Sequence, residues 1–326
     1  KMEAENLLYP LQLQAMMKDY IWGGTKLKTD FHKRTEFEKV AESWELSCHK
    51  AGQSVVLNGE YAGLKLSDYI EKAGKAVLGK NAEKFTDFPI LIKLIDAADN
   101  LSVQVHPENE YALRVEGEYG KTEMWYILDA EEGASLYYGT NKEITKDEFR
   151  ARIEDNTILD VLKKVPVHKG DVFFIESGTI HAIGEGIVIC EIQQNSNTTY
   201  RFYDYHRQDA NGRERELHID KSFDVADFGL HCNKVATPFT DADTTQEKLL
   251  VDRREFSVRL VDVAGSYVLP QDEKRFYCLS NVSADCVLRY QGEELPFAFT
   301  ENIFVPAGCA DIEICGKARI LVSFVR

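Results

Sequence analysis

One short stretch of the sequence brings together three side-chain types that proteins use to bind metal ions. Gln104 and His106 stand two residues apart in LSVQVHP, and Glu123 follows in GKTEMWY. On a β-strand, side chains two apart share a face, so Gln104 and His106 would point away from Val103 and Val105. An amide, an imidazole and a carboxylate in this arrangement fit a metal site, and a solvent-exposed strand face could also carry them.

The composition is that of a globular protein with an acidic surface. The 326 residues are too many for one small core, so we expect one large domain with an appendage, or two domains. Hydrophobic residues make up 44% and charged residues 29%, and no apolar run is long enough to span a membrane. The formal charge of −15 argues against nucleic acid and anionic membranes as partners. A phosphate site would need its own local lysines and arginines.

The cysteines and the N-terminal segment predict a cytoplasmic protein. The seven cysteines are odd in number, scattered, and never spaced as C-x-x-C, which is typical of reduced thiols and not of a cysteine zinc ribbon. The first residues, KMEAENLLYPLQLQ, lack the basic start, apolar core and cleavage site of a secretion signal. The cysteines are Cys48, Cys190, Cys232, Cys278, Cys286, Cys309 and Cys315.

Short β-type runs separated by Gly, Asp and Asn dominate the middle and the end of the sequence. They are rich in Val, Ile, Phe and Tyr, and they show no regular alternation with helical patterns, which favours an antiparallel β-sandwich or jelly roll. The runs are FPILIKLID (88–96), MWYILDA (124–130), DVFFIES (171–177), GIVICEIQQ (186–194), FSVRLVDV (256–263), FYCLS (276–280), CVLRYQG (286–292) and ARILVSFV (318–325).

Helical segments interrupt these strands. We expect one helix at about 67–78, capped by Ser67, and another at about 145–164, where Thr145 and Glu148 have capping-box spacing. A third, short helix is expected at 220–228. The polar segment 232–248 is expected to connect a catalytic domain of residues 1–240 to a smaller β domain of residues 241–326.

A faint internal repeat supports two related halves. FIESGTIHAI, around Gly178, is similar to FVPAGCADIE, around Gly308. His181 of the first copy corresponds to Asp311 of the second, and no histidine follows His231. The second half is therefore expected to be a barrel without a metal site.

Several motifs, in order along nearly the whole chain, resemble one enzyme family. GDVFFIESGTIHAI is close to the second cupin motif, with Glu176 where proline is usual. DYIWGGTKL, AESWELS, QVHP, GKTEMWY, SGTIHAIG and EIQQNSNTTYRFYDY together resemble the zinc-dependent type I mannose-6-phosphate isomerases of short bacterial form. The resemblance implies a mainly β, cupin jelly-roll fold with two β-barrel units and helical insertions.

The resemblance also implies one Zn²⁺ per chain, bound by Gln104, His106, Glu123 and His181. Neutral imidazoles and a carboxylate suit zinc, and an amide oxygen is a tolerable fourth ligand. Two histidines and a carboxylate equally suit non-haem iron. The remaining histidines are expected to be surface or hydrogen-bonded residues: His32, His49, His168, His206, His218 and His231.

The function implied by the resemblance is the interconversion of mannose 6-phosphate and fructose 6-phosphate through a cis-enediol, in a cytoplasmic monomer or homodimer. Two alternatives stay open. One is an iron cupin oxygenase that uses the two histidines and the glutamate, and the other is a catalytically inactive, sugar-phosphate-binding cupin.

Catalysis would also need cations and a proton carrier, and six residues are candidates. Lys121 would share a strand face with Glu123, and Arg201 matches a family position linked to the active site. Glu191 matches a pocket carboxylate that could orient Arg201 or transfer protons. Lys93, Trp22 and Trp44 are candidates for substrate binding, although a snorkelling lysine and two core tryptophans explain them as well. The family more often has Asp at the position of Asn197.

Overall fold

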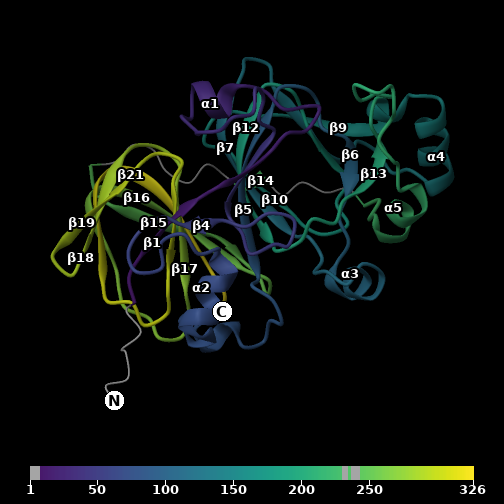
Figure 1. Cartoon of the computed structure of the whole chain (residues 1–326). Helices are drawn as coiled ribbons and strands as arrows, with labels where there is room; N and C mark the ends of the chain where they lie inside the picture. Colours follow the sequence, from purple (N-terminus) through teal and green to yellow (C-terminus); the bar gives the residue numbers. More distant parts are fainter. Residues whose placement is uncertain (1–7, 230–233, 236–242) are drawn as a thin grey trace. The chain divides into compact units, whose positions relative to one another are not determined.

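The computed structural model describes residues 8–229, 234–235 and 243–326, and the chain divides into two compact units. The central unit holds residues 17–43 and 94–237, and the terminal unit holds the two ends of the chain together with residues 44–93. The predicted domain boundary after residue 240 and much of the predicted connection at 232–248 lie outside the described residues. Figure 1 shows both units as strand-rich.

The central unit is built on two sheets. A seven-stranded sheet has the order β14 (Lys234–Val235), β10 (Val172–Ile175), β7 (Glu123–Ala130), β12 (Ile187–Gln194), β5 (Ile90–Ala97), β3 (Glu42–Leu46) and β2 (Met16–Lys18). A five-stranded antiparallel sheet has the order β13 (Tyr200–Tyr203), β6 (Val103–Val105), β11 (His181–Ile183), β8 (Ser135–Thr140) and β9 (Leu162–Pro166). Strands β3 and β5 run across the division between the units.

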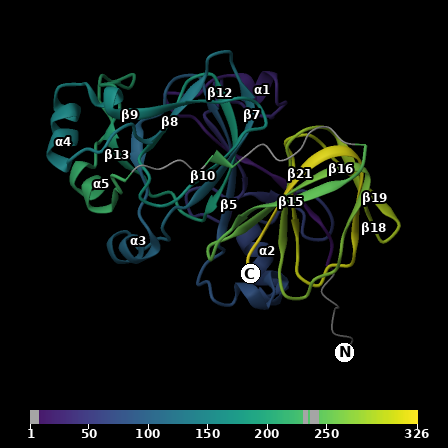
Figure 2. The same ribbon diagram turned by 180° about the vertical axis from the view of Figure 1, so that it is seen from behind.

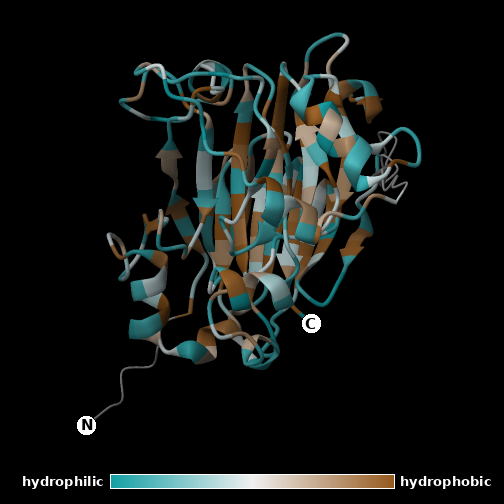
Figure 3. Cartoon of the chain, turned by 90° about the vertical axis from the view of Figure 1, so that its right-hand side faces the viewer, coloured by the Kyte–Doolittle hydropathy of each residue, from teal (hydrophilic) through white to brown (hydrophobic). Residues whose placement is uncertain are grey.

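Alternation along these strands creates two apolar layers in the central unit. Trp125 and Ile127 of β7 share one buried cluster with Leu136 of β8 and Ile183 of β11, so the inner faces of the two sheets form one core. The opposite face of the five-stranded sheet contributes Val103, Val105 and Phe202 to a second cluster. Residues between them in sequence, such as Gln104, therefore point to the inner face, as predicted. In Figure 3 the hydrophobic colour is concentrated along the strands.

Helices cover the outer face of the five-stranded sheet. Phe149 of α4 (Lys146–Glu154) and Phe223 of α5 (Ile219–Val225) belong to the second apolar cluster, and Figures 1 and 2 both show these helices beside β13. The remaining helices are α1 (Lys26–Thr29), α2 (Leu66–Ala73) and α3 (Asn109–Val115), with 3₁₀ turns η1 (Lys75–Leu78), η2 (Lys80–Ala82) and η3 (Ile158–Val161). Among the described helices, none has the length and hydropathy to cross a bilayer.

The capping predictions had different outcomes. Thr145 precedes α4, and its side chain accepts a hydrogen bond from the Glu148 amide, as the sequence predicted. Ser67 was wrong as a cap, because α2 begins at Leu66 after Lys65, which places Ser67 inside the first turn. The predicted 145–164 helix ends at Glu154, and after the 3₁₀ turn η3 the chain enters strand β9.

The terminal unit contains a single nine-stranded sheet around its own apolar core. The sheet has the order β15 (Gln246–Asp252), β16 (Ser257–Leu269), β21 (Ile312–Phe324), β17 (Tyr277–Asn281), β20 (Asn302–Val305), β1 (Leu11–Gln14) and β4 (Val55–Val56), and β18 (Cys286–Tyr290) and β19 (Glu293–Phe297) branch from β21. The mainly β class with helical insertions is therefore confirmed. Gly178 and Gly308, the repeat glycines, both adopt positive φ, at 87° and 80°.

Candidate metal centre

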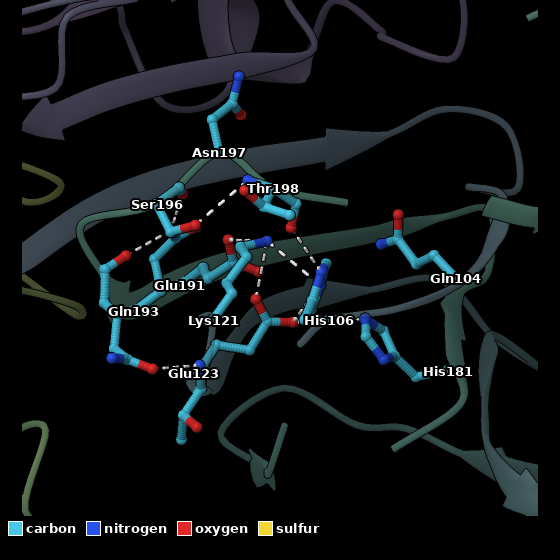
Figure 4. A network of polar contacts seen from close by, with 12 residues as sticks. Gln104, His106, Lys121, Glu123, His181, Glu191, Gln193, Ser196, Asn197 and Thr198 are labelled. Atoms are coloured by element: carbon cyan, nitrogen blue, oxygen red, sulfur yellow. Dashed lines mark hydrogen bonds and ion pairs between the residues drawn. The ribbon is translucent and has the colours of Figure 1, made fainter. Parts of the chain in front are cut away.

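Three predicted metal ligands meet inside the central unit because three strands begin or end at one place. His106 directly follows β6, Glu123 is the first residue of β7, and His181 is the first residue of β11. Their ligand atoms all lie within 4.8 Å of one another, and all three side chains are buried. Figure 4 shows them converging from separate strands.

Glu123 stands between the two imidazoles. Its Oε1 lies 3.7 Å from Nε2 of His106 and 3.5 Å from Nε2 of His181. The opposite ring nitrogens, both Nδ1, are hydrogen-bonded to backbone carbonyls, at 3.1 Å to Thr198 and 2.9 Å to Thr179. A carbonyl only accepts, so each Nδ1 carries the proton and each Nε2 presents its lone pair to Glu123.

Burial fixes the charge state of the three groups. The pKa of His106 is lowered to about 3, first by burial and then by the neighbouring Lys121 cation, and burial also lowers the pKa of His181. Burial by itself would raise the pKa of Glu123, but Lys121, together with the neighbouring His106 and His181, outweighs burial and holds that pKa well below its usual value. At neutral pH the site thus presents two neutral imidazoles and one carboxylate, the protonation state that metal binding requires.

A divalent metal ion fits these residues. Nε2 of His181 and Oε1 of Glu123 are buried and accept no hydrogen bond, which is costly unless another group satisfies them. Ligand atoms about 2.0–2.1 Å from a tetrahedral metal lie roughly 3.4 Å apart, close to the two separations at Glu123. The carbonyl contacts at Nδ1 are of the kind that orient histidine ligands in metal sites.

Gln104 lies next to this cluster in the five-stranded sheet. It pairs with His181 on one side and with Arg201 on the other, so the three residues form a row on the inner face. Its side chain is half-buried, and Figure 4 shows it beside the two histidines. This position suits a fourth ligand, which stays a prediction.

Lys121 contacts the cluster directly. Its Nζ lies 2.9 Å from Oε2 of Glu123 and 3.3 Å from Nε2 of His106. On the other side Nζ lies 3.8 Å from Oε1 of Glu191, whose Oε2 accepts a 2.9 Å hydrogen bond from the indole of Trp125. Lys121 precedes β7 instead of lying within it, but its side chain reaches the face that the sequence predicted.

Arg201 lies further along the same row. It is half-buried, its Nη1 is 3.5 Å from the carbonyl of Glu216, and its Nε is buried without a partner. Burial lowers the pKa of Arg201, and the nearby Arg215 cation lowers it further. Tyr20, which was not a predicted site residue, is close enough for its acidity to respond to Arg201, Lys121 and Arg215, although burial is the main cause that raises its pKa to about 12.

The predicted substrate-binding residues are all buried. Trp22 is 4% exposed and packs in the inner core of the central unit. Trp44 and Lys93 belong to the terminal unit, where Nζ of Lys93 lies 5.0 Å from the centre of the Trp44 ring. These contacts match the core alternative for the tryptophans, and a role in substrate binding stays a prediction for all three. Asn197 is exposed, and Figure 4 shows its side chain directed away from the metal ligands.

Sequence reasoning missed two residues that lie beside the predicted site residues, Trp125 and Arg215. Trp125 stands two positions after Glu123, so strand periodicity places it on the same face, and that signal was available. It packs edge-on against His181, with ring centres 5.4 Å apart. Arg215 lies in an irregular segment without periodicity, and only the folded chain brings it near Arg201.

Comparisons with known proteins agree with the fold. Residues 10–134 match the family model of the type I phosphomannose isomerase catalytic domain, and residues 245–325 match the mannose-6-phosphate isomerase cupin domain, which confirms the predicted cupin fold. A mannose-6-phosphate isomerase of Streptococcus mutans is 44% identical over 80% of this chain and 81% of that protein. One from Bacillus subtilis is 38% identical over 96% of this chain and 98% of that protein.

Solved structures of mannose 6-phosphate isomerases also have the fold of this chain. The crystal structure of a Bacillus subtilis mannose 6-phosphate isomerase superposes with a TM-score of 0.88 at 33% identity, and the match covers 96% of this chain and 99% of that one. A mannose 6-phosphate isomerase bound with zinc and yttrium shares the fold, with a TM-score of 0.75 at 18% identity.

Proposed function

This chain is a member of the type I mannose-6-phosphate isomerase family, and we propose that it interconverts mannose 6-phosphate and fructose 6-phosphate. The observation that carries the proposal is the buried cluster of His106, Glu123 and His181, in a chain that matches these isomerases over nearly its whole length. The predicted family is thereby confirmed, and the substrate is assigned from the names of the relatives.

The metal of this proposal is one zinc ion, held by Gln104, His106, Glu123 and His181. The donor set, the neutral imidazoles and the unsatisfied buried lone pairs support it. When bound, zinc would supply Lewis-acid polarisation of the substrate's C1 and C2 oxygens.

Lys121 is assigned as an electrostatic partner of the reacting oxygens and not as a base. Burial alone would lower its pKa, but Glu123 and Glu191 outweigh burial and raise the pKa above the usual lysine value. The ammonium therefore stays charged at neutral pH. A fixed positive charge in a water-excluded site stabilises negative charge that develops on an oxygen during the reaction.

Glu191 is the proposed proton carrier. The isomerisation removes the proton from C2 and returns a proton to C1, while the O2 hydroxyl loses its proton and O1 gains one, so the substrate passes through a cis-enediol. A carboxylate can carry the carbon-bound proton in both directions. Glu191 is 2% exposed, and the Trp125 indole and Lys121 fix its two oxygens, so it is held in one orientation.

A coupled assay on mannose 6-phosphate, with and without a chelator, tests the function. We expect turnover that chelation removes and added zinc restores, and metal analysis should give one zinc per chain. No turnover with zinc restored, together with retained sugar-phosphate binding, would show an inactive binding protein. Oxygen uptake by iron-loaded protein would instead support the oxygenase alternative.

A further inference from the structure

Backbone carbonyls orient both histidines of the metal cluster, but the two carbonyls come from different places in the chain. Nδ1 of His181 donates to the carbonyl of Thr179, two residues earlier. Nδ1 of His106 donates to the carbonyl of Thr198, which is 92 residues away. Thr198 belongs to residues 195–199, an irregular connection between strands β12 and β13. The orientation of His106 therefore depends on the contacts that fix this connection.

The side-chain amide of Gln193 holds the connection from inside the protein. Gln193 is the next-to-last residue of β12 and is fully buried. Its Nε2 donates two hydrogen bonds of 2.7 Å, one to the carbonyl of Gln194 and one to the carbonyl of Ser196. The amide of Ser196 donates to the same Gln194 carbonyl at 2.8 Å. One side chain thus fastens the first turn of the connection to the end of the strand.

Ser196 extends this constraint to Thr198. Its Oγ accepts a 3.2 Å hydrogen bond from the Thr198 amide, two residues ahead, and the residue is fully buried. A hydroxyl that bonds the backbone two residues on restricts the turn that it spans. Figure 4 shows the contacts that run from Ser196 through Thr198 to His106. The position of the Thr198 carbonyl is therefore fixed by two buried side chains, Gln193 and Ser196.

The solvent side of the connection has a weaker anchor. Oε2 of Glu118 accepts hydrogen bonds from the Asn197 amide at 3.1 Å and from Oγ1 of Thr198 at 3.4 Å. Asn197 is exposed and Glu118 is half-buried, so water competes for these contacts. The carbonyls bonded by Gln193 have no such replacement, because a donor lost from a buried place leaves its acceptor unpaired. We therefore expect the buried contacts to decide the position of the carbonyl.

The other half of the Gln193 amide is unsatisfied. Its Oε1 is buried and has no hydrogen-bond donor in the described part of the chain. An amide that is only half paired is destabilising in a core, and an apolar side chain of the same size would avoid that penalty. The favourable contribution of the amide is therefore made by Nε2, and both bonds of Nε2 end on the connection that carries Thr198.

We propose that Gln193 and Ser196 are positioning residues of the metal centre, which act by fixing the Thr198 carbonyl that orients His106. They act through this carbonyl and not as ligands. The inference rests on the proposed function for its metal ion, and it adds the contacts that keep Nε2 of His106 directed at that ion.

The zinc affinity of the full-length protein tests the inference. Gln193→Met keeps the side-chain volume and removes both donors. We expect its Kd for zinc, measured by competition with a chelator, to rise about 10- to 100-fold, as is usual when a group that orients a metal ligand is lost. Gln193 is also the cross-strand neighbour of Glu123, so Ser196→Ala provides a second, more distant change and should raise the same Kd by a smaller factor.

A double variant tests whether the two side chains act through one carbonyl. If they do, Gln193→Met combined with Ser196→Ala should raise the zinc Kd by less than the product of the two single increases. Independent effects, which multiply, would overturn the shared route through Thr198.

The matched control is Asn281→Leu in the terminal unit. Asn281 is also a buried amide, and its Nδ2 donates to the carbonyls of Ala284 and Phe297 at 2.8 and 3.0 Å. Both Asn281→Leu and Gln193→Met should lower the melting temperature of the metal-free protein, but only Gln193→Met should raise the zinc Kd. The visible absorption of cobalt-loaded protein, which responds to ligand geometry, should likewise change only in Gln193→Met.

The outcomes separate this inference from the proposed function. An unchanged zinc Kd in Gln193→Met, or an increase that Asn281→Leu shares, overturns the inference alone. If Gln193→Met does not fold, Ser196→Ala decides by the same measurement. A parent protein that binds zinc but does not isomerise mannose 6-phosphate overturns the proposed function, and the Kd comparison still decides the inference. A parent protein that binds no zinc overturns both.

Discussion

Nζ of Lys121 lies 2.9 Å from Oε2 of Glu123 while the other oxygen of that carboxylate faces two histidines. Both residues of the pair are almost completely buried. The lysine therefore neutralises part of the negative charge of the site without taking the place of a ligand. One oxygen of the carboxylate contacts the Lys121 cation, and the other faces the position of the metal. We therefore expect a change at Lys121 and a change at a metal ligand to have different consequences.

Replacing Lys121 with Met should lower kcat and leave metal content unchanged. The methionine fills a similar volume but removes the fixed positive charge, and loss of one such stabilising group typically costs about 10²- to 10³-fold in kcat. Steady-state kinetics and metal analysis of the same preparation measure the two effects. A kcat within threefold of the parent value would exclude Lys121 from the reaction.

Replacing His181 with Ala should remove both the metal and the activity. A ligand that binds only the folded protein raises its melting temperature, so added zinc should stabilise the metal-free parent protein and not this variant. The control is His168→Ala, because His168 is an exposed histidine whose side chain is 78% accessible. That variant should keep its zinc, its turnover and the zinc-dependent shift. Zinc bound tightly by His181→Ala would mean that the ligand set is wrong.

Trp125→Phe should impair turnover by releasing Glu191. The phenyl ring still packs against His181, but the 2.9 Å hydrogen bond to the carboxylate is lost, and a buried acceptor without its donor costs about 1–3 kcal/mol of stability. We expect kcat to fall about tenfold with an altered pH profile. Phe173→Leu, at the cross-strand neighbour of Trp125, should lower the melting temperature without changing the pH profile. If the two variants behave alike, Trp125 is only a packing residue.

Local pattern was enough to predict the faces of the strands, and less reliable for helix ends. Period-two alternation placed Gln104 opposite Val103 and Val105, and it placed Lys121 on the side of Glu123. It works because one face of each strand must be buried. Ser67 and Thr145 were both predicted to cap a helix, but only Thr145 does, because α2 starts two residues earlier than a cap at Ser67 allows.

Non-local features could not be predicted in the same way. Strand β1 pairs Leu11 with Phe304, so an N-terminal segment completes the sheet formed by the C-terminal strands. Such pairing depends on which distant segments meet, and short apolar runs do not encode their partners individually. The Asp204–Arg215 pair could not be predicted for the same reason. Its two members come from loops that are brought together by β13 and the turn at Tyr205.

Alanine substitutions at Thr145 and Ser67 test directly whether only Thr145 caps its helix. Thr145→Ala should lower the free energy of unfolding by about 1 kcal/mol, because the Glu148 amide loses its acceptor. Ser67→Ala should change it by less than about 0.5 kcal/mol, as is usual for a substitution that removes no cap. Denaturant unfolding of both variants measures the two values. An equal loss in both would mean that Ser67 caps α2 in solution.

Acid should remove the contribution of Asp204 to stability. Burial by itself raises the pKa of this carboxyl, but hydrogen bonds from Arg215 and then Arg207 outweigh it, so the pKa in the folded protein lies below its usual value. A carboxyl with a lowered folded-state pKa stabilises the protein above its unfolded-state pKa, about 3.9, and that contribution is lost as the pH falls further. Asp204→Asn should therefore be less stable than the parent protein at pH 7, by about 1.5–3 kcal/mol, because it loses charge-assisted hydrogen bonds to a partly exposed arginine. This difference in the free energy of unfolding should shrink below about pH 4. Denaturant unfolding of both proteins at pH 7 and at pH 3.5 measures it.

A difference in unfolding free energy that stayed constant across this range would show that Asp204 is not ionised in the folded protein. Arg215 would then lack the charged acceptor that orients it.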